Sequence, residues 1–292
     1  QAARDVVAQF KAGPPYGFFI EQDQRDPVAA VEMLRRLAYN GIGVKRLSSE
    51  VTLDGVSHPA GTWVIPMDQP NANFVRQLFA VQDYPDLREY PEGPPGQPYD
   101  VSGWTLPYLF GVRVIEARTP LDDAVRGAME DLSSEPLGWL AEGDAQSWDS
   151  PPGVGFDSHP VARGIVPPAG AASGGGGSLI LDPAQNNSYK ALAEAWRRGG
   201  SARFQSGAAG SDGQGGSSGR WIVSGLGGGV QNELVADYAL RASRGGSAGT
   251  PVGQPRIGLY RPWSASMDEG WSRWLMEMYG IAHTNLYNAD VR

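Results

Sequence analysis

The feature that most constrains the fold of this 292-residue chain is a strand-helix-strand unit that it uses twice. In each copy an apolar strand leads into a helical pattern and a second apolar strand follows, and the copies cover residues 17–66 and 178–224. Ile20 precedes Asp26 by the same number of residues as Leu181 precedes Asn187. A repeated unit of this kind is typical of architecture rather than of an active site.

The repeat predicts an α/β fold of duplicated strand-helix-strand modules with mainly parallel sheets, followed by the first strand-helix-strand of a third, truncated module. The predicted organisation is a tail of a preceding element at 1–13, a first module at 14–132, an irregular linker at 133–177, a second module at 178–245 and the start of a third at 255–292. Residues 171–178 read Ala-Ala-Ser-Gly-Gly-Gly-Gly-Ser, which is typical of a flexible connector.

Local signals bound the elements of the first copy. Asp26 is a good N-cap and Pro27 suits the first helical position. Asn40-Gly41 is expected to end that helix. Asp54-Gly55 predicts the tight turn of a hairpin over 51–64.

The third module is expected to pair a strand at 257–260 in parallel with a strand near 282–286. Between them lies a helix whose apolar residues recur at helical spacing, and these residues predict a buried stripe: Trp271, Trp274, Leu275 and Met278. Because a lone strand-helix-strand cannot cover both faces of a parallel sheet, this end is expected to be a truncated module.

Composition excludes several classes of function. The net charge of −8 argues against nucleic acid and anionic membranes as partners. The absence of cysteine removes disulfides, thiol catalysis and thiolate metal sites. No stretch of the sequence is long and apolar enough for a membrane span, and no signal peptide opens it.

No complete catalytic constellation is evident. Two stretches, 215–219 and 245–249, match the serine-hydrolase pattern G-x-S-x-G, but both lie in low-complexity sequence and are interpreted as linkers. The histidines His58, His159 and His283 have no Glu or His at helical zinc spacing, and we expect surface or turn positions for them. The sequence therefore predicts no catalytic residue and no metal site.

Two further features were weighed as ligand sites. The glycine-rich segment 225–229 follows a strand and opens a helix, but it lacks the third glycine of the dinucleotide fingerprint, so a tight turn is favoured. The candidate binding cluster is Arg261, Trp263, Asp268 and Glu269. For this cluster, helix capping with a buried Trp anchor is favoured over a ligand site.

Several blocks of sequence resemble one protein group. They are Gly61–Pro70 (GTWVIPMDQP), Tyr84–Arg88 (YPDLR), Pro98–Val101 with Trp104–Pro107, Asn186–Ser188, and Gly258–Trp263 (GLYRPW) with Met267–Trp271 (MDEGW). Together they are similar to the long C-terminal region of bacterial zinc carboxypeptidase-like proteins of the carboxypeptidase A type. In that group a peptidase domain comes first, α/β modules follow, and the last resembles a class I glutamine-amidotransferase fold.

The departures from that group limit what the resemblance implies. The peptidase needs a His-x-x-Glu pair with a later His on zinc, and this sequence has no such pair. The amidotransferase fold needs a Cys nucleophile, and this sequence has no Cys. No catalytic or metal role therefore transfers to any residue, and zinc is implied for the parent peptidase domain alone.

The resemblance implies a non-catalytic accessory region of a secreted or periplasmic zinc carboxypeptidase-like metallopeptidase. Its expected partner is the peptidase domain of the same parent protein, on which it would pack or to which it would shape access. The alternative is an independent extracellular module that binds a sugar or a peptide. Exposure of Trp263 in a concave pocket would favour the alternative.

Overall fold

A computed structural model describes residues 1–81, 85–96, 105–132, 159–207 and 219–291. These residues form two compact units. The first takes in residues 1–24 together with 29–132 and 159–166 of the described chain, and the second takes in 167–291 with the short stretch 25–28. Each unit is described by itself.

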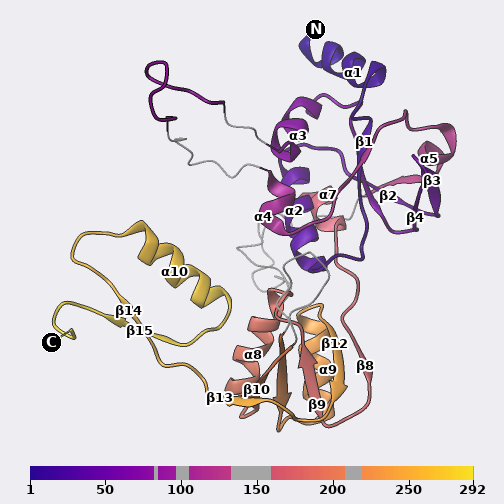
Figure 1. Cartoon of the computed structure of the whole chain (residues 1–292). Coiled ribbons are helices and arrows are strands. Elements are labelled where there is room, and N and C mark those ends of the chain that lie inside the picture. The colour runs from indigo at the N-terminus through magenta and orange to yellow at the C-terminus, as the bar shows by residue number, and fades with distance from the viewer. Residues whose placement is uncertain (82–84, 97–104, 133–158, 208–218, 292) are drawn as a thin grey trace. The chain divides into compact units, whose positions relative to one another are not determined.

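The first unit contains the elements that Figure 1 draws from indigo to magenta, with a last short helix further along the chain. They are α1 (Ala2–Ala12), β1 (Gly17–Ile20), α2 (Pro27–Tyr39), β2 (Lys45–Leu47), β3 (Val51–Leu53), β4 (Val56–His58), β5 (Trp63–Pro66), α3 (Ala72–Phe79), α4 (Leu106–Phe110), β6 (Ile115–Ala117), α5 (Asp123–Ala128), β7 (Met129–Asp131) and α7 (Pro160–Gly164).

The sheet of the first unit has the strand order β6-β1-β5-β2-β7, and every neighbouring pair is antiparallel. Strands β1 and β2 run in the same direction because helix α2 joins them, but β5 lies between them. The hairpin β3–β4 interrupts the connection between β2 and β5. Strand β5 then runs antiparallel to both β1 and β2. The chain order β-α-β-β-α-β, with a strand inserted into the β-α-β unit, is the split β-α-β or ferredoxin-like arrangement.

The second unit contains the elements that Figure 1 draws from salmon to yellow. They are β8 (Ala171–Gly174), β9 (Ser178–Leu181), α8 (Asn187–Arg197), β10 (Ser201–Ser206), β11 (Gly219–Ser224), α9 (Gly228–Asp237), β12 (Arg241–Gly245), β13 (Thr250–Val252), β14 (Ile257–Tyr260), α10 (Met267–Met278) and β15 (His283–Leu286).

The sheet of the second unit repeats the topology of the first. Its order, β13-β10-β11-β9-β12-β8, places β12, β9, β11 and β10 as β6, β1, β5 and β2 are placed in the first sheet. The register agrees as well, since Ile20 pairs with Trp63 and Leu181 pairs with Trp221. The duplication predicted from the sequence is therefore present at the level of strand order.

The prediction of mainly parallel sheets was wrong. Of the eleven pairings between described strands, nine are antiparallel, and only β12–β8 and β14–β15 are parallel. A strand-helix-strand pattern shows that two strands share a direction, but it does not show that they are neighbours. In the first module β5 lies between β1 and β2, and in the second module β11 lies between β9 and β10. Each inserted strand runs antiparallel to both of its neighbours.

The predicted connector at 171–178 is also different in the structure. Ala171–Gly174 form β8, which pairs in parallel with β12 over four residues, from Ala171 opposite Arg241 to Gly174 opposite Arg244. Within the span predicted as irregular linker, the structure further shows the helix α7. A small, Gly- and Ala-rich strand can lie at a sheet edge without contributing a hydrophobic pattern, so periodicity did not detect it.

The two sheets bury their apolar residues in different ways. In the first unit β1 and β5 are buried along their whole length, and the face with Phe19 and Val64 forms a cluster with residues of the β3–β4 hairpin and α5. In the second unit α8 and α9 share one cluster with alternate strand residues such as Leu179 and Leu181. Alternate residues of a strand point to opposite faces, so these clusters define one packed face of each sheet.

Several local predictions of the first copy were confirmed. Oδ1 of Asp26 accepts a hydrogen bond from the backbone N–H of Val28 at 3.1 Å, which caps α2. Asp54 and Gly55 have φ of 53° and 76°, the left-handed pair that a tight hairpin turn requires. Gly41, with φ of 80°, follows the end of α2 as predicted.

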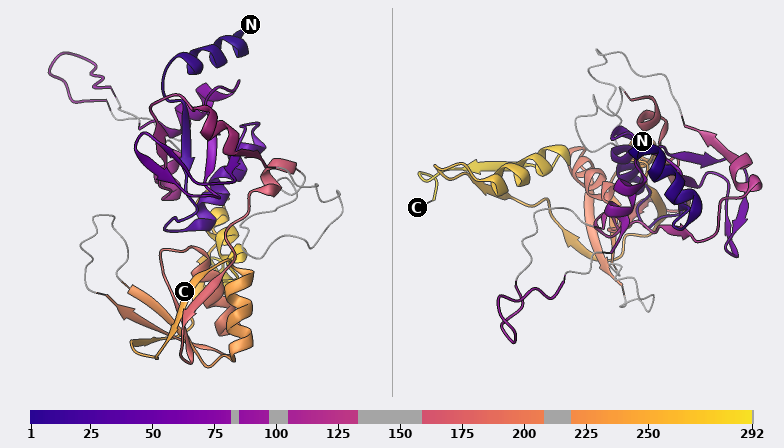
Figure 2. Two further views of the ribbon diagram at one scale, coloured as in Figure 1. Left: turned by 90° about the vertical axis from the view of Figure 1, so that its right-hand side faces the viewer. Right: turned by 90° about the horizontal axis from the view of Figure 1, so that it is seen from above.

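The C-terminal segment is a parallel β14-α10-β15 unit, and Figure 2 shows α10 running along the strand pair. Ile257 lies opposite His283 and Tyr260 opposite Leu286, which confirms the predicted parallel pairing. The predicted buried stripe on α10 was wrong, because no residue of this helix is buried. The helix has the expected amphipathic pattern, but Trp271, Trp274 and Leu275 on its apolar side are exposed.

Candidate functional site

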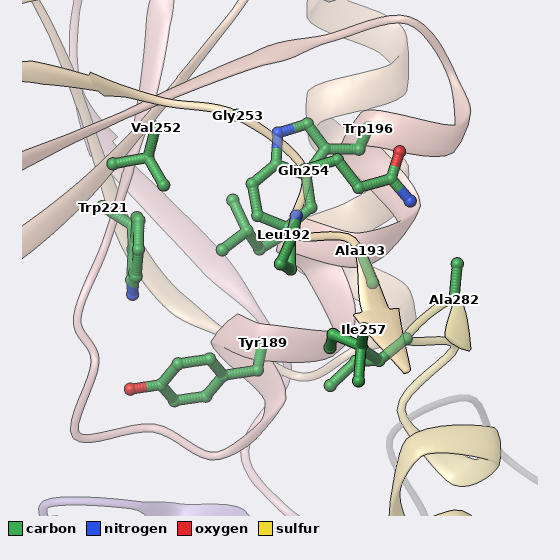
Figure 3. Close-up of a pocket in the computed structure, with 12 residues that line it drawn as sticks. Tyr189, Leu192, Ala193, Trp196, Trp221, Val252, Gly253, Gln254, Ile257 and Ala282 are labelled. Carbon is green, nitrogen blue, oxygen red and sulfur yellow. The ribbon is translucent and has the colours of Figure 1, made fainter. Parts of the chain in front are cut away.

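A pocket of about 250 Å³ opens in the second unit beside α8. Figure 3 shows that Tyr189 and Trp221 lie on one side of it and that Ile257 and Ala282 lie on the other. The lining residues are Tyr189, Leu192, Ala193, Trp196, Trp221, Val252, Gly253, Gln254, Pro255, Ile257, Ile281 and Ala282.

Helix α8 provides one wall of the pocket because of its periodicity. Tyr189, Leu192, Ala193 and Trp196 follow one another at the i, i+3, i+4 and i+7 positions, so they share one side of the helix. Leu192 is also part of the core cluster, against which Trp196 packs. One margin of this apolar stripe therefore packs in the core, and the other margin lines the pocket.

The remaining lining residues come from the sheet and from the C-terminal segment. The indole of Trp221 packs edge-to-face on Phe204, with ring centroids 4.8 Å apart, and the ring of Tyr189 lies 6.5 Å from it. These contacts hold the Trp221 ring in place as a rigid wall. Nε1 of Trp221 is buried and has no hydrogen-bond partner among the described residues.

The pocket has an apolar, uncharged lining. None of its twelve lining residues carries a charge, and its polar groups are the Tyr189 hydroxyl, the indole N–H groups and the Gln254 amide. At the C-terminal end of α8, Glu194 accepts hydrogen bonds at 2.6 Å from Arg197 and Arg198. The hydrogen bond from Arg197 lowers the pKa of Glu194 and keeps the carboxylate ionised.

A second polar cluster lies in the first unit around His58. The imidazole is buried and stacks on Phe19, with ring centroids 4.2 Å apart. Its Nδ1 lies 3.7 Å from Oε1 of Glu21, which is beyond hydrogen-bond length, while Oε2 of Glu21 accepts a 2.6 Å bond from Arg113. Burial lowers the pKa of His58, and the attraction of Glu21 opposes this effect without overcoming it.

The His58 cluster has the features of a structural site. Of its members, Glu21 is neutralised by Arg113, and His58 is neutral because burial lowers its pKa. The sequence interpretation of His58 as a surface or turn residue was wrong, because the hairpin β3–β4 folds its side chain onto β1. His159 instead caps α7 through Nδ1, and His283 lies on β15.

The predicted binding cluster is spread over the loop and first turn that follow β14. Trp263 is 96% exposed, so the predicted buried anchor was wrong. Glu269 is held within α10, where its Oε1 accepts a 2.9 Å bond from Arg273. The backbone N–H of Arg261 donates a hydrogen bond to the carbonyl oxygen of Leu286. Asp268 is exposed in the first turn of α10.

The predicted helix start at Asp268 and Glu269 was confirmed, but the N-cap is Ser266 and not a residue of the predicted cluster. Oγ of Ser266 accepts a hydrogen bond from the backbone N–H of Glu269 at 3.3 Å, so Ser266 is the N-cap of α10. The acidic residues Asp268 and Glu269 occupy the first turn, where they favour the positive end of the helix dipole. None of the four predicted binding residues lines the α8 pocket.

Around this loop the structure exposes a group of large apolar side chains that we call the α10 surface: Trp263, Met267, Trp271, Trp274 and Leu275. Trp271 is 62% exposed and Leu275 is 50% exposed. The rings of Trp271 and Trp274 meet edge-on at 5.9 Å.

The other sequence motifs take ordinary structural positions. Residues 246–249 join β12 to β13, so no helix follows the serine of this G-x-S-x-G match. In the other match, residues 215–218 lie outside the described residues. The glycine-rich segment 225–229 leads from β11 into α9, with Gly227 as the N-cap, as predicted for a tight turn.

The described residues contain neither a cluster of metal-ligand side chains nor a helix that could span a membrane. Among these residues, no group of three or more His, Cys, Asp or Glu side chains could hold a metal ion. No helix within the described ranges combines the length and the apolar character that crossing a bilayer requires.

The pocket was missed by sequence reasoning, although one signal for it was present. The apolar stripe on α8 contains two aromatic residues, Tyr189 and Trp196. Tyr189 is 37% exposed. An apolar stripe can be wider than the area that one face of a sheet covers. Such a stripe indicates that the helix makes a second apolar contact.

Comparison of the chain with protein-family models, with curated proteins and with solved structures finds no match. The site is therefore interpreted from its own residues.

Proposed function

We propose that this chain is a non-catalytic accessory region of a zinc carboxypeptidase-like protein, and that it packs on the peptidase domain of that protein or shapes access to it. The observation that carries the proposal is the α10 surface. Large apolar side chains that are exposed on one helix, as Met267, Trp271 and Leu275 are on α10, are typical of a surface that binds a protein partner. Tryptophan and methionine are enriched at the centres of such interfaces.

The resemblance of the sequence blocks supplies the identity of this partner. The block that resembles the group most specifically, Gly258–Trp263 with Met267–Trp271, covers β14, the following loop and the start of α10. The resembling block therefore contains three of the five residues of the α10 surface, Trp263, Met267 and Trp271. The same resemblance supports a secreted or periplasmic location.

The segment β14-α10-β15 is proposed to be the opening unit of a class I glutamine-amidotransferase-like sheet. Its parallel strand pair and crossover helix support this proposal, because sheets of that class are built from such units. The sequence contains no Cys, so the nucleophile of an active amidotransferase has no counterpart in these residues.

Binding to the peptidase domain encoded by the same gene tests the proposal. The purified chain and that domain are titrated by calorimetry, with Trp271→Ser/Trp274→Ser as the test variant and Tyr108→Ser as the control. Tyr108 is 72% exposed and belongs to α4, away from the α10 surface in sequence. We expect the test variant to bind at least about tenfold more weakly and the control to bind like the wild type.

Two outcomes would contradict the proposal. One is a parent gene that encodes no peptidase domain with a His-x-x-Glu pair and a later His. The other is unchanged binding by the double tryptophan variant. Tight, stoichiometric zinc together with carboxypeptidase turnover by the purified chain would contradict its non-catalytic character.

The alternative function, an independent extracellular module for a sugar or a peptide, is favoured by the exposure of Trp263. A flat exposed indole can stack on a sugar ring or on a peptide side chain. However, Trp263 does not line the pocket, so the concave setting that such a site requires is not provided there. A glycan and peptide binding screen with Trp263→Ala as the control variant tests this alternative.

A further inference from the structure

We propose that the α8 pocket is a binding site for one uncharged aromatic ring system, either a small free molecule or an aromatic side chain of a peptide. This site is separate from the α10 surface and does not depend on the proposed accessory role. The proposal rests on the size of the pocket, on its lining and on the rigidity of its walls.

The size of the pocket limits the ligand. A cavity of about 150 Å³ holds benzene, and this pocket measures about 250 Å³. It can therefore accommodate a one-ring or two-ring molecule of the size of phenol or indole. Larger ligands would project through its mouth, where Tyr189 and Ala282 are exposed.

The lining selects against charged and highly hydroxylated ligands. Without a charged residue in its wall, the pocket offers no partner that would compensate an ionised group for the loss of hydration. A sugar carries several hydroxyl groups, and each of them needs a partner when it is buried. The polar groups of the lining are too few to provide them, so this pocket does not suit the sugar arm of the alternative function.

The walls favour an aromatic ligand over an aliphatic one. Tyr189, Trp196 and Trp221 contribute three ring systems, and aromatic pairs gain from edge-to-face and offset contacts beyond the area that they bury. The ring of Trp221 is already held by Phe204, so little side-chain freedom is lost when a ligand binds. Aliphatic side chains, among them Leu192, Val252 and Ile257, complete the wall.

Indole is the probe that tests the site. We expect the wild-type chain to bind indole saturably, as followed by the side-chain N–H signals of its tryptophans in nuclear magnetic resonance spectra. In Ala282→Trp a large ring is placed at the exposed rim of the pocket, and binding should weaken by at least about tenfold because the volume is filled. The control Trp263→Ala removes a ring outside the pocket and should leave the affinity unchanged.

Ala282 is exposed, so its substitution does not disturb a packed core, and circular dichroism checks that the fold is retained. Titration with N-acetyl-tryptophanamide distinguishes the source of the ring: binding at least as tight as that of indole assigns a peptide side chain, and binding of indole alone assigns a small molecule. Three results would overturn the proposal: no saturable indole binding, equal binding of glucose, or full binding by Ala282→Trp.

Discussion

At the scale of single residues, His58 makes the stability of the first unit depend on pH. Its ordinary pKa of 6.5 is lowered in the folded protein by burial, against the attraction of Glu21 and Asp54. Folding therefore favours the neutral form of the His58 ring. The contribution of this preference to the free energy of unfolding is fully present above pH 6.5. It is lost as the pH falls below 6.5 towards the lowered pKa, because the unfolded chain binds the proton first.

We expect urea denaturation to show lower stability at pH 5.5 than at pH 7.5 for the wild type, and a smaller difference for His58→Phe. Phenylalanine keeps the stacking on Phe19 and removes the titrating group. Glu21 stays paired with Arg113 in this variant. His283→Gln is the control, and it should retain the wild-type pH dependence. An equal pH dependence in His58→Phe would show that other groups cause it.

The tryptophans divide into structural and exposed residues. Trp63 is 1% exposed on β5, whereas Trp271 is 62% exposed on α10. We expect Trp63→Ala to destabilise the chain by about 3–5 kcal/mol. Trp271→Ala should change the free energy of unfolding by less than about 0.5 kcal/mol in the free chain. Chemical denaturation measures both, and a large loss in Trp271→Ala would mean that α10 is packed.

At the scale of elements, β8 is the clearest case of a strand hidden in glycine-rich sequence. A Cβ atom on Gly170, just before the strand, would lie 1.9 Å from the carbonyl oxygen of Val235 at the end of α9. Neither backbone can yield easily, so Gly170→Ala should cost about 1–3 kcal/mol of stability. Gly175→Ala is the matched control, since nothing lies within 4 Å of its Cβ position. Equal, neutral effects of both substitutions in thermal denaturation would restore the connector interpretation.

At the scale of the whole molecule, the two modules share a topology but have separate core clusters. Ile20 and Leu181 occupy equivalent positions, each fully buried and each paired with a tryptophan of the neighbouring strand. Replacing either residue by alanine should cost about 2–5 kcal/mol. We expect Ile20→Ala to lower one transition in calorimetry and Leu181→Ala to lower another. A single transition that both variants lower equally would instead show one cooperative unit.

The sequence by itself determined the features that depend on neighbouring residues. Hydrophobic periodicity and capping indicated the helices, as Asp26 and the Asp54-Gly55 turn show. Equal spacing revealed the duplication, and one short crossover unit gave the parallel pairing of β14 with β15. In each case the interaction that decides the structure lies within a few residues or within one compact repeat.

The tertiary structure alone decided which strands are neighbours, which apolar residues are covered and where the pocket lies. Insertion of β5 between β1 and β2, and of β11 between β9 and β10, converts the expected parallel sheets into antiparallel ones. The pocket is lined both by α8 and by Ile257 and Ile281, which are distant from α8 in the sequence. Contacts of this kind depend on long-range packing and hydrogen bonding between strands, and local periodicity carries no information about them.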